Sequence, residues 1–239
     1  MCATLRGLEI LALLKQMLGN THELIVSSFK EQQGEPQYYD SMARFCKKHG
    51  IVFFETKPGA SIYGKYDLAL MIHWRYMTPQ AFIDALPLGA VVIHDSLLPK
   101  YRGFSPTAWA IADGQTECGA TMFYPNKEMD CGDIIDQMRV EIKSTDTIKE
   151  VFEKVTDVYK KLVRNNIFDI ILKTASRTPQ NHTDATSRPK RKADDYKIDL
   201  SKSADEIIDL VRASVAPYPG AFIEANGRKM RIIKVRFET

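Results

Sequence analysis

The segment Ala90–Gly103 has the sequence AVVIHDSLLPKYRG, and its first four residues form the apolar, β-branched pattern of a buried strand. His94 follows directly, where the strand opens into a loop. In a parallel sheet covered on both faces, ligands bind beyond this end of the strands. The loop contains a proline and basic residues, and it enters a helix at Pro106 with Ser105 in the N-cap position. We therefore expect an anionic ligand near this loop.

Further apolar runs flank this segment and recur every 15–30 residues. The predicted strands are Glu23–Ser28, Ile51–Glu55, Tyr66–His73, Ala90–His94, Ala120–Tyr124 and Gln137–Ile142. Helical patterns lie at Leu8–Leu18, at Tyr38–Lys48 and after Asp146 or Thr147. This alternation predicts an α/β fold with a doubly wound, mostly parallel sheet. Because the first helix begins by Leu8, any strand before it is only a few residues long.

The chain changes character at Thr174–Lys197, which is polar and carries the basic residues Arg188 and Lys190–Lys192. This basic group is either a solvated loop or a phosphate contact. A helix at Ala204–Ala213 follows. A hairpin then pairs 221–224 with 229–235 across Asn226-Gly227, a strong turn signal. We expect a catalytic domain at 1–178, and a linker with a small helix-plus-hairpin subdomain at 179–239.

The composition is that of an ordinary globular protein, with 239 residues, 44% hydrophobic and 26% charged. A net charge of +3 is too small to indicate nucleic acid by itself. No apolar run approaches the roughly 20 residues of a membrane helix, and the N-terminus lacks a signal-peptide pattern. The four cysteines are scattered, which favours free thiols. We therefore expect a cytoplasmic protein without membrane contact.

A second polar turn, Asp130-Cys131-Gly132-Asp133, follows the Ala120–Tyr124 run. Taken alone, a histidine at a strand end and an aspartate in a turn are weak signals, because both are often structural. Together with their surroundings they are specific. His94–Gly103 resembles the His-x-Ser-Leu-Leu-Pro-x-x-Arg-Gly signature of the folate-dependent formyltransferases, and 119–135 resembles that family's Gly-x-Thr…Asp-x-Gly-x-Ile pattern. Residues 198–222 are similar to the segment that follows the formyltransferase domain.

The resemblance implies a Rossmann-like formyltransferase core, 10-formyltetrahydrofolate as the formyl donor, and no metal. It also implies a catalytic trio of asparagine, histidine and aspartate. His94 and Asp130 match two of these positions, with Asp130 orienting His94 and relaying the amine proton. The asparagine position is occupied by Val92, which offers no hydrogen-bond donor for the formyl oxygen. Since such a donor contributes about 10²–10³ in rate, we look for a substitute at His73, Arg75 or Tyr76; the alternative is that these three only line the pterin slot.

The resemblance also implies two sets of binding residues. Those for folate are Trp74, Arg75, Tyr76, Met77, Cys131 and Asp133. Those for the acceptor substrate are Ser96, Lys100, Tyr101, Arg102, Gly103 and Arg191.

The acceptor has three candidate identities. The first is a nucleotide-linked amino sugar, as in precursors of surface glycans such as lipopolysaccharide O-antigen. The second is methionyl-tRNA or another amine, and the third is no acceptor at all, in a non-catalytic folate or sugar binder. Only nineteen residues follow Gly220, too few for the further barrel domain of the tRNA enzymes, and a tRNA-binding protein usually has a broad basic surface. We therefore expect a nucleotide-sugar substrate, no nucleic acid and, from the family, a homodimer.

Overall fold

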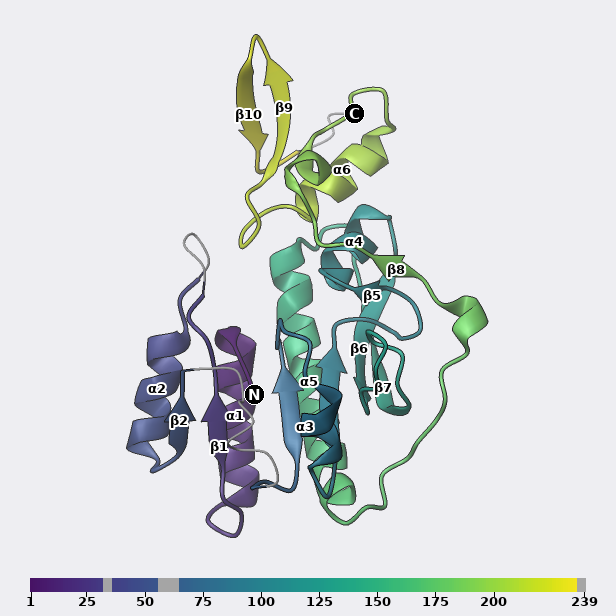
Figure 1. Ribbon diagram of the computed structural model, residues 1–239. Coiled ribbons are helices and arrows are strands. Elements are labelled where there is room, and N and C mark those ends of the chain that lie inside the picture. Colours follow the sequence, from purple (N-terminus) through teal and green to yellow (C-terminus); the bar gives the residue numbers. More distant parts are fainter. Residues whose placement is uncertain (32–35, 56–64, 236–239) are drawn as a thin grey trace. The chain divides into compact units, whose positions relative to one another are not determined.

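The computed structural model describes residues 1–31, 36–55 and 65–235 (Figure 1). These residues form two compact units, and each unit is built from three segments of the chain. Unit 1 consists of Met1–His94, Thr121–Gln137 and Tyr159–Gln180. Unit 2 consists of Asp95–Ala120, Met138–Val158 and Asn181–Thr239. The predicted domain boundary between residues 178 and 179 is not the division between these two units. The predicted domains stay a prediction.

Two sheets contribute to unit 1, and each contains a parallel strand pair. Strand β1 pairs with β2, and β3 pairs with β4, in both cases parallel, whereas β6 joins β4 antiparallel. The order β3-β4-β6-β7 makes a four-stranded sheet. The bounds are β1 Ile25–Ser27, β2 Val52–Phe54, β3 Ala69–Ile72, β4 Ala90–His94, β6 Glu117–Phe123 and β7 Ile134–Glu141. All six predicted strands are therefore confirmed, each shifted by at most three residues at either end.

The residues before the first helix, Met1–Ala3, make an isolated parallel bridge from Cys2 to Ile72 rather than a full strand. The amide of Cys2 donates to the carbonyl of Ser27 at 3.1 Å, and the amide of Ala3 donates to Ile72 at 3.2 Å. These bonds place the first three residues between β1 and β3, which belong to two separate sheets. A stub of three residues is thus long enough to join the two strand pairs, because both of its edges find backbone partners.

Three helices pack on the strands of unit 1, and a fourth joins them with its C-terminal half (Figure 1). Their bounds are α1 Thr4–Leu18, α2 Tyr39–Lys48, α3 Gln80–Asp84 and α5 Ile148–Ile171. Phe82 of α3 packs with Ala69, Met71 and Ala90, the alternate residues on one face of β3 and β4. On α5, Lys160 pairs with Glu9 of α1 at 2.7 Å. The side chain of Glu150 accepts from the amide of Thr147, so Thr147 is the residue that caps α5.

Unit 2 contains the shorter elements. They are β5 Arg102–Gly103, α4 Pro106–Ala112, η2 His182–Asp184, β8 Ser187–Arg188, η3 Ala193–Tyr196, α6 Ala204–Arg212, β9 Ala221–Ala225 and β10 Arg228–Ile232. The predicted hairpin is confirmed, with positive φ at Asn226 (52°) and Gly227 (70°). Ser203 and Glu206 form a capping box at α6. Ser105 and Pro106 occupy the predicted N-cap and first helical positions of α4, but the φ of Ser105 is 52° and its side chain makes no cap hydrogen bond.

The four cysteines are all free, as predicted. In the part of the chain that the structure describes, no helix combines the length and the apolar character needed to cross a membrane.

Candidate active site

His94 and Asp130 lie close together in unit 1. His94 is the last residue of β4, and Asp130 lies in the turn between β6 and β7. The Nδ1 atom of His94 is 3.7 Å from Oδ2 of Asp130, with side chains only 11% and 14% exposed. This is an ion-pair distance, longer than a hydrogen bond. The geometry is consistent with a carboxylate that orients the imidazole and stabilises it when it carries charge.

The turn that carries Asp130 is held tightly. Asp130 has a φ of 55°, in the left-handed region. Gly132 lies so close to the carbonyl oxygen of Tyr124 that a Cβ atom there would be 1.7 Å away. The buried side chain of Gln180 donates from Nε2 to the carbonyl oxygens of Asp130 (2.9 Å) and Gly132 (2.8 Å). The position of the carboxylate is therefore set by packing and by two hydrogen bonds.

His73 follows β3 and lies beside His94, because Ile72 is paired with Ile93 in the parallel register. This confirms the prediction that the strand ending near His73 lies beside the strand ending at His94. His73 has a φ of 51°, which breaks the strand's alternation of side chains. Its Nδ1 is 3.2 Å from Oγ1 of Thr4, and its Nε2 is 2.8 Å from NH1 of Arg6. Both ring nitrogens of this candidate oxyanion donor thus have partners within unit 1.

The residues after His73 form an aromatic group with Phe29. The ring of Phe29 is 5.5 Å from Trp74 and 5.1 Å from Tyr76, both edge-on, and Arg75 lies over it at 5.6 Å. Tyr76 and Met77 are exposed. Four predicted folate-binding residues are therefore contiguous, and three of them gather around one ring. Their contact with folate, and the roles of Arg75 and Tyr76 as oxyanion donors, stay predictions.

Val92 is a packing residue. It is partly buried and packs, with Trp74, against the apolar group of Ala69, Met71 and Phe82 under α3. The position that the family resemblance assigns to an asparagine therefore belongs to the core under α3.

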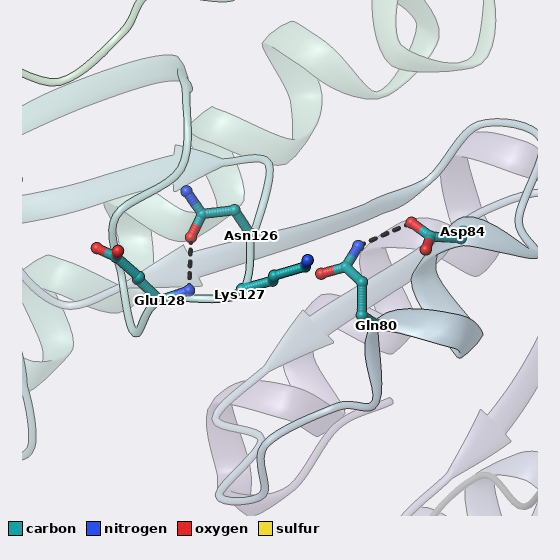
Figure 2. A pocket seen from close by; sticks show the side chains of 5 residues that line it. All are labelled: Gln80, Asp84, Asn126, Lys127 and Glu128. Carbon is teal, nitrogen blue, oxygen red and sulfur yellow. Dashed lines mark hydrogen bonds between the residues drawn. The ribbon is translucent and has the colours of Figure 1, made fainter.

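A surface hollow of about 430 Å³ lies in unit 1 near this turn (Figure 2). It is lined by Gln80 and Asp84 of α3 and by Asn126, Lys127 and Glu128, which precede Asp130. Figure 2 shows the side chain of Lys127 extending toward Gln80, which itself donates to Asp84 at 2.8 Å. None of the predicted site residues lines this hollow. The remaining predicted folate residues lie on the turn itself: the thiol of Cys131 donates to Met129, and the carbonyl of Asp133 accepts from Tyr124.

The loop after His94 belongs to unit 2, where it is shaped by its own hydrogen bonds. Ser96 Oγ donates to the carbonyl oxygen of Lys100 at 2.7 Å, and β5 pairs parallel with β8. Gly103, with a φ of 98°, approaches Arg188 so closely that a Cβ atom would be 2.4 Å from its carbonyl oxygen. Ser96, Lys100 and Tyr101 line a narrow recess of about 40 Å³. The structure thus gathers three of the predicted substrate-binding residues.

Tyr101 and Arg102 use their polar atoms within unit 2. The Tyr101 hydroxyl donates to Asp113 at 3.0 Å, and burial together with this carboxylate raises the pKa of Tyr101 to about 12. The side chain of Arg102 is buried and lies 3.2 Å from Nδ1 of His182, which must accept because a guanidinium only donates.

Arg191, which the family resemblance assigned to substrate binding, is buried. Its NH1 donates to the carbonyl of Ala213, and its NH2 donates to Asp195 and Ser214. Its guanidinium lies 4.3 Å from the ring centroid of Tyr196, and burial lowers its pKa. Only Nε finds no hydrogen-bond partner among the described residues. The predicted contact of Arg191 with substrate stays a prediction. Its observed hydrogen bonds support a structural role, in which it holds Asp195 to Ala213 and Ser214.

Three residues that contact the candidate site or its immediate neighbours are not predicted from the sequence: Arg6, which bonds His73; Tyr159, which bonds Ile93; and Gln180, which bonds Asp130. Tyr159 lies on a helical face that predicts core packing, Arg6 lies before the predicted helix Leu8–Leu18, and Gln180 lies in a polar stretch. One signal for Arg6 was available, since a lone cation stands just before an apolar helical pattern. Tyr159 and Gln180 carried no signal of their own.

Comparison with known proteins agrees with this geometry. Residues 62–167 match the Formyl transferase family, and residues 190–239 match the family of its C-terminal domain. The chain belongs to the formyl transferase family. A methionyl-tRNA formyltransferase from Latilactobacillus sakei subsp. sakei (strain 23K) is 32% identical over 166 residues. That match covers 70% of this chain and 52% of the relative, so it spans about half of the relative's length.

Among solved structures, a 4-N formyltransferase from Francisella tularensis has 26% identity and a TM-score of 0.78, covering 97% of this chain and 95% of its own. An N-formyltransferase from Helicobacter canadensis, solved with folinic acid and dTDP-3-aminofucose, has 20% identity and a TM-score of 0.78. It covers 97% of this chain and 84% of its own. The fold is therefore that of the formyltransferases, with a Rossmann-like core and a C-terminal subdomain, as predicted.

Proposed function

We propose that the protein transfers a formyl group from 10-formyltetrahydrofolate to the amino group of a nucleotide-linked sugar. The observation that carries this proposal is the 3.7 Å pairing of His94 with Asp130 at the end of β4, in a chain of the formyl transferase family. The Asp130 side chain is only 14% exposed, and Gln180 holds the backbone of the turn that carries it.

The chemistry uses these two side chains. A neutral amine attacks the formyl carbon, which forms a C–N bond and a tetrahedral intermediate with a positive nitrogen and a negative oxygen. His94 takes the ammonium proton, with Asp130 stabilising the imidazolium. The bond from carbon to N10 of the folate then breaks, N10 receives the proton, and the products are a formamide and tetrahydrofolate. The negative oxygen needs a donor other than Val92.

The sugar acceptor is supported by relatives. The Francisella protein is a 4-N formyltransferase that matches this chain over nearly its whole length. The Helicobacter complex shows that this fold holds a reduced folate and a dTDP-linked amino sugar together. Lys100, on the loop before β5, carries charge suited to a diphosphate, whereas Arg188 of β8 is paired with Asp113.

The test is a donor and acceptor assay. The protein is incubated with 10-formyltetrahydrofolate and a panel of nucleotide-linked amino sugars, and mass spectrometry looks for the gain of one CO on the sugar. His94→Ala serves as the inactive control. Transfer to one member of the panel, saturable in both substrates, is the expected result. Failure with every sugar would overturn the proposal.

Methionyl-tRNA is the second candidate acceptor, because the curated relative with 32% identity is a methionyl-tRNA formyltransferase. The same assay with charged initiator tRNA tests it. Formylation of the tRNA at a rate above that of any amino sugar would establish this alternative. A protein that binds folate but formylates neither acceptor would be a non-catalytic relative.

A further inference from the structure

Arg6 is a buried cation in unit 1, only 4% exposed, in the first turn of α1. Its NH1 lies 2.8 Å from Nε2 of His73, and its Cζ lies 4.6 Å from the ring centroid of Tyr159. A buried charge is costly unless hydrogen bonds or aromatic faces stabilise it. The two contacts therefore tie α1 to the end of β3 and to α5.

The hydrogen bond from Arg6 fixes the proton of His73. A guanidinium carries only donors, so Nε2 of His73 must accept and holds no proton. The proton then resides on Nδ1, which donates to Oγ1 of Thr4 at 3.2 Å. A doubly protonated ring would direct an N–H at the guanidinium. In this arrangement His73 is neutral and in the Nδ1–H tautomer.

Tyr159 carries the influence of Arg6 to β4. The Tyr159 hydroxyl donates to the carbonyl oxygen of Ile93 at 2.7 Å, and Ile93 directly precedes His94. The Tyr159 ring also meets the His73 ring edge-on at 6.3 Å. His73 and Thr4 both have left-handed backbones, with φ of 51° and 67°. Such backbone conformations persist only where the surroundings hold them, and here Arg6 is bonded to one of the two residues.

We propose that Arg6 is a positioning residue for formyl transfer: it holds His73 neutral and Tyr159 in place, and so sets the end of β4 that presents His94. The inference rests on the proposed function and deepens it. It assigns His73 to the support of the site, with its ring nitrogens directed at Thr4 and Arg6.

Among the described contacts of His73, the charged or titratable groups are Arg6 on α1 and Tyr159 on α5, with His94 beside it at the end of β4. The same two helices carry Glu9 and Lys160. Glu9 and Lys160 are paired with each other at 2.7 Å. Arg6 is the cation whose hydrogen bond decides where the His73 proton resides.

The first test determines the tautomer and protonation of the His73 ring by nuclear magnetic resonance. It uses nitrogen-labelled histidine, with His73→Gln for assignment. In the unmodified protein we expect the Nδ1–H tautomer, unchanged across neutral and mildly acidic pH. In Arg6→Met, which removes the donor, the ring should take up a second proton as the pH falls. An Nε2–H tautomer or ordinary titration in the unmodified protein would overturn the inference, whether or not the variant folds.

The second test is kinetic. Arg6→Met should lower kcat by about tenfold to a hundredfold, the scale of a displaced catalytic group, with KM for both substrates within about twofold. Arg6→Lys keeps the charge but loses the planar guanidinium, so its kcat should lie between that of the unmodified protein and that of Arg6→Met. Tyr159→Phe should lower kcat in the same direction, and the exposed Arg44→Met is the matched control. No transfer by the unmodified protein would refute the proposed function. Transfer with unchanged kcat in Arg6→Met would refute only the role of Arg6.

Discussion

Gln180 Nε2 donates a 2.9 Å hydrogen bond to the backbone carbonyl of Asp130, a residue 50 positions earlier in the chain. The same nitrogen donates to Gly132, so one amide satisfies two carbonyls of the turn. Because the Asp130 backbone is left-handed, these bonds oppose relaxation of a strained turn. A polar residue with no sequence signature thus fixes the distance between the candidate catalytic pair.

Replacing Gln180 with alanine should therefore affect activity and stability together. Two carbonyls lose their partner, at a cost of about 1–3 kcal/mol each where no water replaces it. We expect kcat to fall about tenfold and the free energy of unfolding in urea to drop on the scale of these two lost hydrogen bonds. Gln16→Ala, at an exposed site on α1, is the control. Unchanged kcat in a less stable Gln180→Ala protein would limit Gln180 to a structural role.

His94 and Asp130 should behave as one unit. His94→Ala and Asp130→Ala should each remove most of the turnover, because the imidazole requires the carboxylate at 3.7 Å for orientation. The double variant should lose little more than the worse single variant, as groups that act together are not additive. Single-turnover rates of the three variants provide the measurement. Fully additive losses would mean that the two residues act independently.

The absent asparagine gives a prediction about Val92. If a side chain replaces its donor, Arg75→Ala or Tyr76→Ala should lower kcat by about 10²–10³ while folate affinity stays nearly constant. Val92→Asn should partly restore that variant. Since Val92 packs under α3, the asparagine also costs stability, so rescue must be measured on the folded fraction. Near-normal turnover in both alanine variants would point to water or a backbone amide as the donor.

The sequence predicts local features well where one physical cause dominates. Ala90–His94 is a strand with the predicted bounds, because a short, unbroken apolar run that ends in a loop is typical of a buried strand. Asn226-Gly227 forms the hairpin turn, because both residues adopt positive φ. His94 and Asp130 were paired only through the family resemblance, since a histidine and an aspartate 36 positions apart carry no local signal of contact.

The supporting residues could not be predicted, because their roles depend on the tertiary structure. Arg6 reaches His73 across 67 positions, and Arg191 is buried among carbonyls and tyrosine rings although its neighbours in the sequence indicate a solvated cluster. For Arg6 and Arg191 a long-range contact outweighs the local preference. Ser105 stands at the N-cap position of α4, but its backbone is left-handed and its side chain makes no cap hydrogen bond.

Tyr101 provides a pH test of the loop in unit 2. Burial, and then the carboxylate of Asp113, raise its pKa from 10 to about 12. The unfolded chain thus releases this proton near pH 10, whereas the folded chain holds it until about pH 12. The contribution of Tyr101 to stability is therefore full below pH 10 and is lost as the pH rises toward about 12.

Urea unfolding of the unmodified protein and of Tyr101→Phe, at pH 9 and between about pH 10 and 12, measures this difference. Other tyrosines also have a raised pKa, so the quantity that matters is the gap between the two proteins. The unmodified protein should lose more stability than Tyr101→Phe across that window. Asp113→Asn should lower the pKa of Tyr101 without restoring it fully, because burial remains. Parallel pH curves for the unmodified protein and Tyr101→Phe would show that folding does not raise the pKa of Tyr101.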